Sequence, residues 1–83
     1  MFYVYVLQSE KDKKLYIGAT NNLKRRFREH QIGKSKATMP RRPFKLVSYI
    51  AVENEKIGRK LEEYLKKGSG KAFLKKRILT DEA

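Results

Sequence analysis

Two tyrosine-bearing runs near the start of the chain, Phe2-Tyr3-Val4-Tyr5-Val6-Leu7 and Tyr16-Ile17-Gly18, decide the fold that we expect. Both are rich in β-branched and aromatic residues, which favour strands. The polar segment between them, residues 8–14, is typical of a hairpin turn. Because side chains alternate along a strand, the first run should present two faces: Tyr3, Tyr5 and Leu7 on one, and Phe2, Val4 and Val6 on the other.

The two phenols of Tyr5 and Tyr16 can meet on one face of this hairpin. A register that sets Tyr5 opposite or diagonal to Tyr16 would bring their side chains within reach of each other. Such a polar pair on an otherwise apolar ribbon marks a candidate site.

Length and composition indicate one small domain over residues 1–83. The chain has no cysteine, which excludes disulfides and thiolate metal sites within it. No apolar run approaches the roughly 18 residues of a membrane span. No signal-peptide pattern is present, and we therefore expect a soluble, cytoplasmic protein.

The charge points to a polyanionic partner. The sequence has 21 Lys and Arg against 9 Asp and Glu, a net charge of +12. Self-repulsion of this size destabilises a small domain, whereas binding to phosphates releases counterions and is favoured. A generic solubilising surface is the alternative. We expect DNA as the partner, with RNA less favoured, and no membrane, because no amphipathic helix has a spare apolar face.

The middle of the chain predicts a helix, a loop and a strand. Asn21 and Asn22 are good N-cap residues for a helix from Leu23 to His30, and Gly33 is a suitable stop. Residues 33–43 contain two prolines and no periodicity, which predicts a basic loop. Residues 44–52 return to strand composition.

The last third predicts two helices. Glu53 and Asn54 should cap a helix that runs to about Lys67, with an apolar stripe of Ile57, Leu61, Tyr64 and Leu65. Gly68-Ser69-Gly70 should break it before a short basic helix. The predicted class is α+β, a small three-stranded antiparallel sheet flanked by helices in the order β-β-α-β-α-α.

Arg26 and His30 lie four residues apart and share one helix face. An arginine offers a fixed fork for phosphate oxygens, and a histidine can donate or accept a proton near neutral pH. Together they suit a phosphodiester site. Each alone has an ordinary alternative, because such an arginine is usually solvated and a histidine beside an apolar stripe is usually a core residue.

Two adjacent acids, Glu62 and Glu63, flank the apolar stripe of the second predicted helix on opposite sides. One of them could anchor Mg²⁺ through a single carboxylate, with waters completing its shell. The alternative is a surface ion pair with Lys66. A second acid cluster is absent from the sequence, which argues against a two-metal site.

In order along the chain, Tyr3-Val4-Tyr5, Tyr16-Ile17-Gly18, Arg26, His30 and a helical glutamate resemble the GIY-YIG nuclease family, most closely its small stand-alone bacterial members. The resemblance covers residues 2–79. It implies catalytic roles for Tyr5, Tyr16, Arg26, His30 and Glu62, a structural role for Gly18, and one Mg²⁺ (or Mn²⁺) ion on Glu62. The first motif lacks its leading glycine, and no asparagine follows Glu62.

The resemblance implies a metal-dependent endonuclease that hydrolyses DNA phosphodiester bonds with low sequence specificity, in DNA repair or recombination. A tyrosine assisted by His30 would deprotonate water, and whether Tyr5 or Tyr16 takes the proton stays open. Arg26 would stabilise the transition state. Basic residues would hold the phosphate backbone: Lys34, Lys36, Arg41, Arg42, Lys45, Lys71, Lys75, Lys76 and Arg77. The alternatives are a basic nucleic-acid-binding module that has the same fold but no catalysis, and a small RNA- or ribosome-associated protein. The oligomeric state is open.

Overall fold

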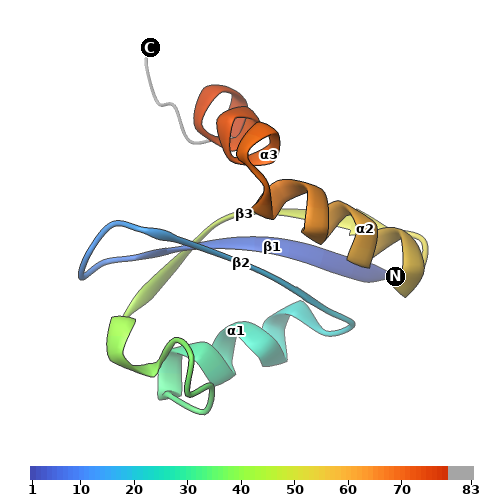
Figure 1. Ribbon diagram of the computed structural model, residues 1–83. Coiled ribbons are helices and arrows are strands. Elements are labelled where there is room, and N and C mark those ends of the chain that lie inside the picture. The colour runs from blue at the N-terminus through green and yellow to red at the C-terminus, as the bar shows by residue number, and fades with distance from the viewer. Residues whose placement is uncertain (79–83) are drawn as a thin grey trace.

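In the computed structural model, the protein is a three-stranded sheet with helices on both faces (Figure 1). The structure describes the backbone of residues 1–78 and the side chains of residues 1–76. The strands and helices are β1 (Phe2–Ser9), β2 (Leu15–Thr20), α1 (Leu23–Ile32), β3 (Phe44–Val52), α2 (Glu55–Lys66) and α3 (Gly68–Phe73). A 3₁₀ turn, η1 (Met39–Arg41), precedes β3, and a π-helical segment, η2 (Leu74–Ile78), continues α3. The predicted α+β class and the order β-β-α-β-α-α are confirmed.

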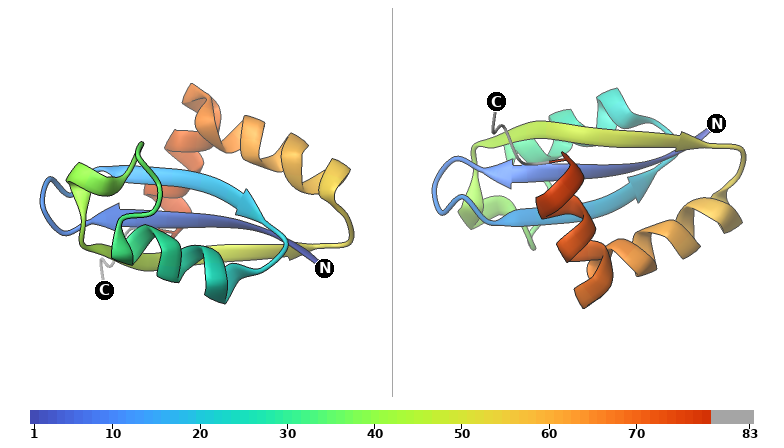
Figure 2. Two further views of the ribbon diagram at one scale, coloured as in Figure 1. Left: turned by 90° about the horizontal axis from the view of Figure 1, so that it is seen from below. Right: turned by 90° about the horizontal axis from the view of Figure 1, so that it is seen from above.

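The sheet is antiparallel with the strand order β2-β1-β3, so the most apolar strand lies in the middle. Helix α1 covers one face, and α2 with α3 covers the other (Figures 1 and 2). Strand β2 is therefore an edge strand with helices above and below it. This edge is where side chains from both helical layers can meet.

The predicted alternation along β1 is confirmed, because its two sets of side chains enter two separate cores. Val4 and Val6 pack with Ile17, Leu65 and Leu74 on the face covered by α2 and α3. On the face covered by α1, the buried apolar and aromatic side chains of the core are Tyr5, Leu7 and Phe44.

The predicted caps of both long helices are confirmed. The Asn22 side chain accepts a hydrogen bond from the backbone N–H of Arg25 at 3.0 Å, and Asn54 accepts one from Ile57 at 3.0 Å. Gly33 ends α1 in the left-handed conformation with φ of 85°. A residue with a Cβ adopts that conformation at a cost, which explains why the helix stops at this glycine.

The predicted apolar stripe of α2 is wrong in part. Ile57 and Tyr64 are 44% and 47% exposed, whereas Gly58 and Leu65 are the buried residues of this helix. The cause is close packing on the sheet, since a methyl group at Gly58 would overlap the Phe2 ring. Rotation of the helix onto Gly58 brings Glu62, one turn later, to the side that faces the sheet.

Other boundaries differ from the prediction. The break after α2 lies at Lys67, and the glycines at 68 and 70 open α3 instead of separating two helices. Gly70 is buried against the backbone of Tyr64 and Leu65, where a Cβ would overlap main-chain atoms.

The hairpin turn is shorter than residues 8–14, because β1 extends to Ser9. The Ser9 hydroxyl accepts from the N–H of Lys11 and donates to the Arg41 carbonyl, which ties the turn to the later loop.

Among the described residues, no helix combines the length and hydropathy needed to cross a bilayer.

Candidate active site

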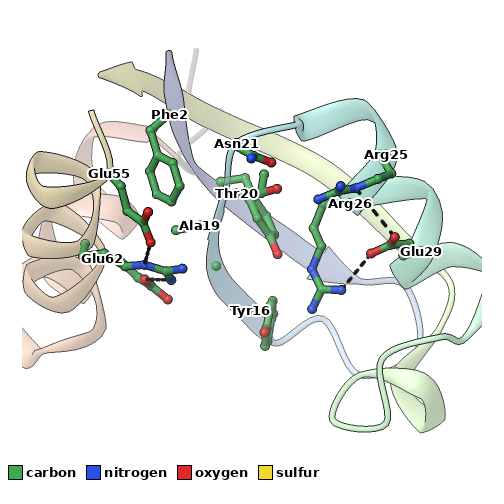
Figure 3. Close-up of a pocket in the computed structure, with 13 residues that line it drawn as sticks. Phe2, Tyr16, Ala19, Thr20, Asn21, Arg25, Arg26, Glu29, Glu55 and Glu62 are labelled. Carbon is green, nitrogen blue, oxygen red and sulfur yellow. Dashed lines mark hydrogen bonds and ion pairs between the residues drawn. The ribbon is translucent and has the colours of Figure 1, made fainter. Parts of the chain in front are cut away.

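A pocket of about 470 Å³ lies along the β2 edge, between α1 and α2. We call it the edge pocket. Three groups of residues line it: Tyr5, Tyr16 and Gly18 from the sheet, Arg26 and Glu29 from α1, and Glu55, Arg59 and Glu62 from α2. Figure 3 shows Arg26 and Glu29 on one side of the pocket and Glu55 and Glu62 on the other. The fold thus brings together residues that are up to 57 positions apart, from Tyr5 to Glu62.

The two tyrosines take the diagonal arrangement that the sequence allowed. Tyr5 pairs with Gly18 and Leu7 pairs with Tyr16 across the β1–β2 ladder, and the centroids of the two phenol rings are 6.4 Å apart. The Tyr5 ring lies over Gly18, where a Cβ would overlap its hydroxyl group. Glycine at this position is therefore what lets the phenol reach the pocket.

A buried hydrogen-bonded chain lies behind Tyr5. The Tyr5 hydroxyl is 2.8 Å from His30 Nε2, and His30 Nδ1 is 2.8 Å from Thr38 Oγ1. Thr38 donates its own hydroxyl proton to the Ser35 carbonyl at 3.4 Å, so its oxygen accepts from His30 Nδ1–H. This assignment leaves Nε2 unprotonated, and the Tyr5 hydroxyl donates to it.

Burial keeps both partners of this hydrogen bond neutral at pH 7. His30 has no exposed surface, and its pKa is lowered to about 4 by desolvation and by the nearby Arg26 guanidinium. Burial also raises the pKa of the Tyr5 phenol, and Arg26 offsets part of that rise. A neutral imidazole that accepts from a neutral phenol is the consistent state.

His30 does not line the edge pocket, but it lies directly behind it: it is hydrogen-bonded to Tyr5, and its ring centroid is 5.1 Å from that of Tyr16. The interpretation of His30 as a core residue is therefore correct, because its side chain is buried. Its hydrogen bond to Tyr5 nevertheless connects it with the pocket, so burial does not exclude a role in moving a proton.

Arg26 reaches the pocket from α1 and is held by Glu29. Arg26 Nη1 is 3.0 Å from Glu29 Oε1, and Arg25 Nε is 3.7 Å from Glu29 Oε2. The hydrogen bond from Arg26 lowers the pKa of the Glu29 carboxyl. One carboxylate thus fixes the arginine fork in the pocket, in a position to bind a phosphate.

Glu62 and Glu63 differ in position, and the structure places in the pocket the glutamate that the family resemblance had indicated, a choice that helical spacing alone left open. The Glu62 side chain is 13% exposed and lines the pocket, whereas Glu63 is exposed to solvent. Glu62 Oε1 is 3.2 Å from Arg59 Nη1, and its Oε2 is 2.9 Å from Lys66 Nζ. Arg59 also pairs with Glu55, at 3.3 Å. Both alternatives raised from the sequence therefore hold for Glu62: it forms the ion pair with Lys66, and it also lines the pocket.

Within the part of the chain that the structure describes, no three acids, histidines or cysteines gather as a metal cage. Mg²⁺ is often bound by one or two carboxylates plus waters and substrate phosphates, and the Glu62 carboxylate fits that pattern. Glu62 fits as the ligand of such a cation if Arg59 and Lys66 release its carboxylate.

Most of the predicted phosphate-binding residues are exposed: Lys34, Lys36, Arg42, Lys45, Lys71, Lys75 and Lys76. Arg41 instead has a structural position, since its Nε is 3.4 Å from Asp12 Oδ2 and its guanidinium stacks 5.8 Å from the Phe44 ring centroid. The side chain of Arg77 lies outside the described residues.

Four residues of the site were missed from the sequence: Glu29, Thr38, Glu55 and Arg59. Glu29 and Arg59 each lie three positions from a candidate residue, so helical spacing could have indicated them. Thr38 comes from a loop without periodicity, and no sequence signal marks it.

Comparisons with known proteins show the family of the chain. A family model described as the GIY-YIG catalytic domain matches residues 1–77. A UPF0213 protein of Clostridium perfringens is 44% identical over 68 residues, which cover 81% of this chain and 72% of that protein. A UPF0213 protein of Syntrophus aciditrophicus is 44% identical over 69 residues, with 81% and 78% covered.

A solved structure is similar as well. The solution NMR structure of a UPF0213 protein from Bacillus halodurans has a TM-score of 0.56 and 32% identity, and the match covers 92% of this chain and 84% of that one. The family model spans both tyrosine runs, Arg26, His30 and Glu62. The chain therefore belongs to the GIY-YIG catalytic domain family, a family of nucleases.

Proposed function

We propose that this protein is an endonuclease that hydrolyses DNA phosphodiester bonds with the help of one divalent cation, Mg²⁺ or Mn²⁺. The observation that supports this proposal is the arrangement of the edge pocket. Arg26 on α1 and Glu62 on α2 face each other across it, with Tyr16 between them (Figure 3), and Tyr5 also lines the pocket. A cation-binding carboxylate and a phosphate-binding arginine on opposite walls suit a phosphodiester held between them.

Arg26 binds the phosphodiester and stabilises the charge that develops on it. Its guanidinium already lies in the pocket, where Glu29 orients it at 3.0 Å. A planar fork of donors matches two phosphate oxygens and keeps that match as negative charge builds up.

Glu62 would hold the cation, and a bound cation would supply positive charge that stabilises the leaving oxygen. Arg59 and Lys66 must first release Glu62, and Arg59 has a second partner ready in Glu55. The Arg59 and Lys66 side chains are each 54% exposed, so water can replace Glu62 beside them and their release costs little free energy.

Tyr5 and His30 provide a path for the proton of the attacking water. The water proton moves to the Tyr5 oxygen while the Tyr5 hydroxyl proton moves to His30 Nε2, 2.8 Å away. The raised pKa of Tyr5 disfavours a free phenolate, so the two transfers must be coupled. A phosphate beside Arg26 offsets the positive charge that lowers the pKa of His30, which favours the second transfer.

Low sequence specificity follows from the nature of the contacts. Exposed lysines and arginines bind the phosphate backbone, which is the same for every sequence. The alternative function is a basic module that binds nucleic acid without cleaving it. The complete set of pocket residues favours the enzyme, because a carboxylate facing a phosphate weakens binding and has no use in a module that only binds.

The test is cleavage of labelled single-stranded, duplex, flap and four-way-junction DNA with Mg²⁺, Mn²⁺ or EDTA. We expect cation-dependent cutting that Glu62→Gln abolishes and that Arg26→Gln lowers by about 10²–10³-fold. A preference for branched DNA would indicate a role in repair or recombination.

Each variant has a matched control on the same helix. Glu63→Gln removes the exposed neighbour of Glu62, and Arg28→Gln removes an exposed arginine of α1. Both controls should cut like the wild type. Binding without cutting under any cation would contradict the proposal and support the binding module, and equal losses in variants and controls would also contradict it.

A further inference from the structure

A second groove lies next to the edge pocket. It has a volume of about 680 Å³ and is lined by five lysines and by part of β2: Lys13, Lys14, Lys66, Lys71 and Lys75, with Leu15, Tyr16 and Ile17. We call it the lysine groove. Tyr16 lines both the edge pocket and the lysine groove, so the two are neighbours at this residue.

The lysines come from parts of the chain that are distant in sequence. Lys13 and Lys14 lie in the turn between β1 and β2, whereas Lys66, Lys71 and Lys75 lie on α2, α3 and η2. The groove therefore has cations on two sides, and only the folded chain places them together.

Several of these charges have no carboxylate partner within the described residues. Lys13 pairs with Glu10 at 3.7 Å and Lys66 pairs with Glu62 at 2.9 Å. In that part of the chain, no ion pair involves Lys14, Lys71 or Lys75. Like charges gathered in one groove repel one another, and a chain of phosphates relieves that repulsion.

We propose that the lysine groove binds the phosphate backbone of the DNA strand that is cut, on one side of the attacked phosphate. The inference rests on the proposed function for the nature of the polymer. Tyr16 then marks the passage from the bound backbone to the edge pocket. This track is distinct from the loop at residues 34–45, because the groove lies beside α2 and α3.

The test compares two triple variants of equal charge. The groove variant carries Lys14→Gln, Lys71→Gln and Lys75→Gln, which spares Lys13 and Lys66 because both have carboxylate partners. The control variant carries Lys24→Gln, Lys56→Gln and Lys60→Gln, which replaces three exposed lysines outside the groove. Thermal unfolding first establishes that both are folded.

Binding to a 20-nucleotide single strand and to its duplex is then measured without divalent cation, over a range of salt concentrations. The groove variant should bind at least about tenfold more weakly at ~0.1 M salt. On the single strand, the plot of the logarithm of the binding constant against the logarithm of the salt concentration should become less steep by about 2, at ~0.7 for each of three lost phosphate contacts. The control variant should lose less than about threefold.

Equal losses in both variants would overturn the inference, because they would indicate a general effect of charge. No loss in the groove variant would overturn it as well. Because binding is measured without cation, a wild-type protein that never cuts would contradict the proposed function and leave this result standing.

Discussion

The two walls of the edge pocket are built from opposite kinds of interaction. On the α1 side, Tyr5, His30 and Thr38 form a hydrogen-bonded chain whose members are at most 1% exposed. On the α2 side, Glu62 is held by Arg59 and Lys66, whose side chains are each 54% exposed. Tyr5 is thus fixed by the buried groups behind it, although Arg26 and Glu29 on the same side form a partly exposed pair. Glu62, in contrast, is held only by half-exposed cations that can exchange.

This difference indicates which part of the site must move. Buried polar groups cost free energy when a partner is removed, whereas exposed ion pairs contribute little and exchange with solvent ions. The α1 wall therefore keeps its geometry before the substrate arrives. The α2 wall can release its lysine and arginine in favour of a cation, and the following predictions test this division.

The largest expected effect is a pH dependence of stability from His30. Its pKa in the folded protein, about 4, is below its unfolded value near 6.5, so the unfolded chain takes up a proton first as the pH falls. This stabilisation is complete above pH 6.5 and is lost progressively between about pH 6.5 and 4, by a total of about 3 kcal/mol.

Urea unfolding across that range measures the effect, with His30→Gln as the comparison. The wild type should lose free energy of unfolding steeply as the pH falls, and His30→Gln should show a much flatter dependence. Parallel curves for the two proteins would mean that the imidazole is not buried in a neutral state.

Gly18→Ala tests whether the Tyr5 side chain can move aside. The added methyl overlaps the phenol, which is held by the buried hydrogen bond to His30. We expect a loss of up to about 3 kcal/mol in the free energy of unfolding, together with loss of cleavage. Unchanged stability with full activity would contradict a fixed α1 wall.

Thr38→Val should have a smaller effect, about 1 to 2 kcal/mol, because it leaves His30 Nδ1 buried without a partner while it preserves the shape of the side chain. Denaturant unfolding measures the loss. Thr38→Ser is the control, since it retains the hydroxyl and should recover most of the stability.

The smallest effect on stability is expected on the α2 wall. Lys66→Met and Arg59→Met each remove an exposed ion pair, so the free energy of unfolding should change by less than about 1 kcal/mol. Mn²⁺ affinity, measured calorimetrically, should rise because Glu62 then has one cationic partner to exchange instead of two. A decrease in stability as large as that of Thr38→Val would show that the two walls are alike.

Much of this arrangement could be predicted from local patterns. Alternation along β1 determines that Tyr5 and Val4 enter different cores, and side-chain caps determine where α1 and α2 begin. These features depend on neighbours a few residues away. The identity of the candidate site residues also came from the sequence, through the resemblance to a nuclease family.

The structure decided what depends on distant contacts. The close approach of Gly58 to Phe2 rotates α2, which exposes Ile57 and Tyr64 and directs Glu62, not Glu63, into the pocket. Thr38 joins the site from a loop without periodicity, and the lysine groove gathers charges from both ends of the chain.

The sequence by itself thus determined the elements, their order and the chemical groups available, because hydrophobic periodicity and capping act over one or two turns of the chain. Only the tertiary structure decided how deeply each group is buried and which charges face one another. Burial and pairing across the sheet set the neutral state of His30 and the position of Glu62, and both arise from packing between segments that the sequence keeps far apart.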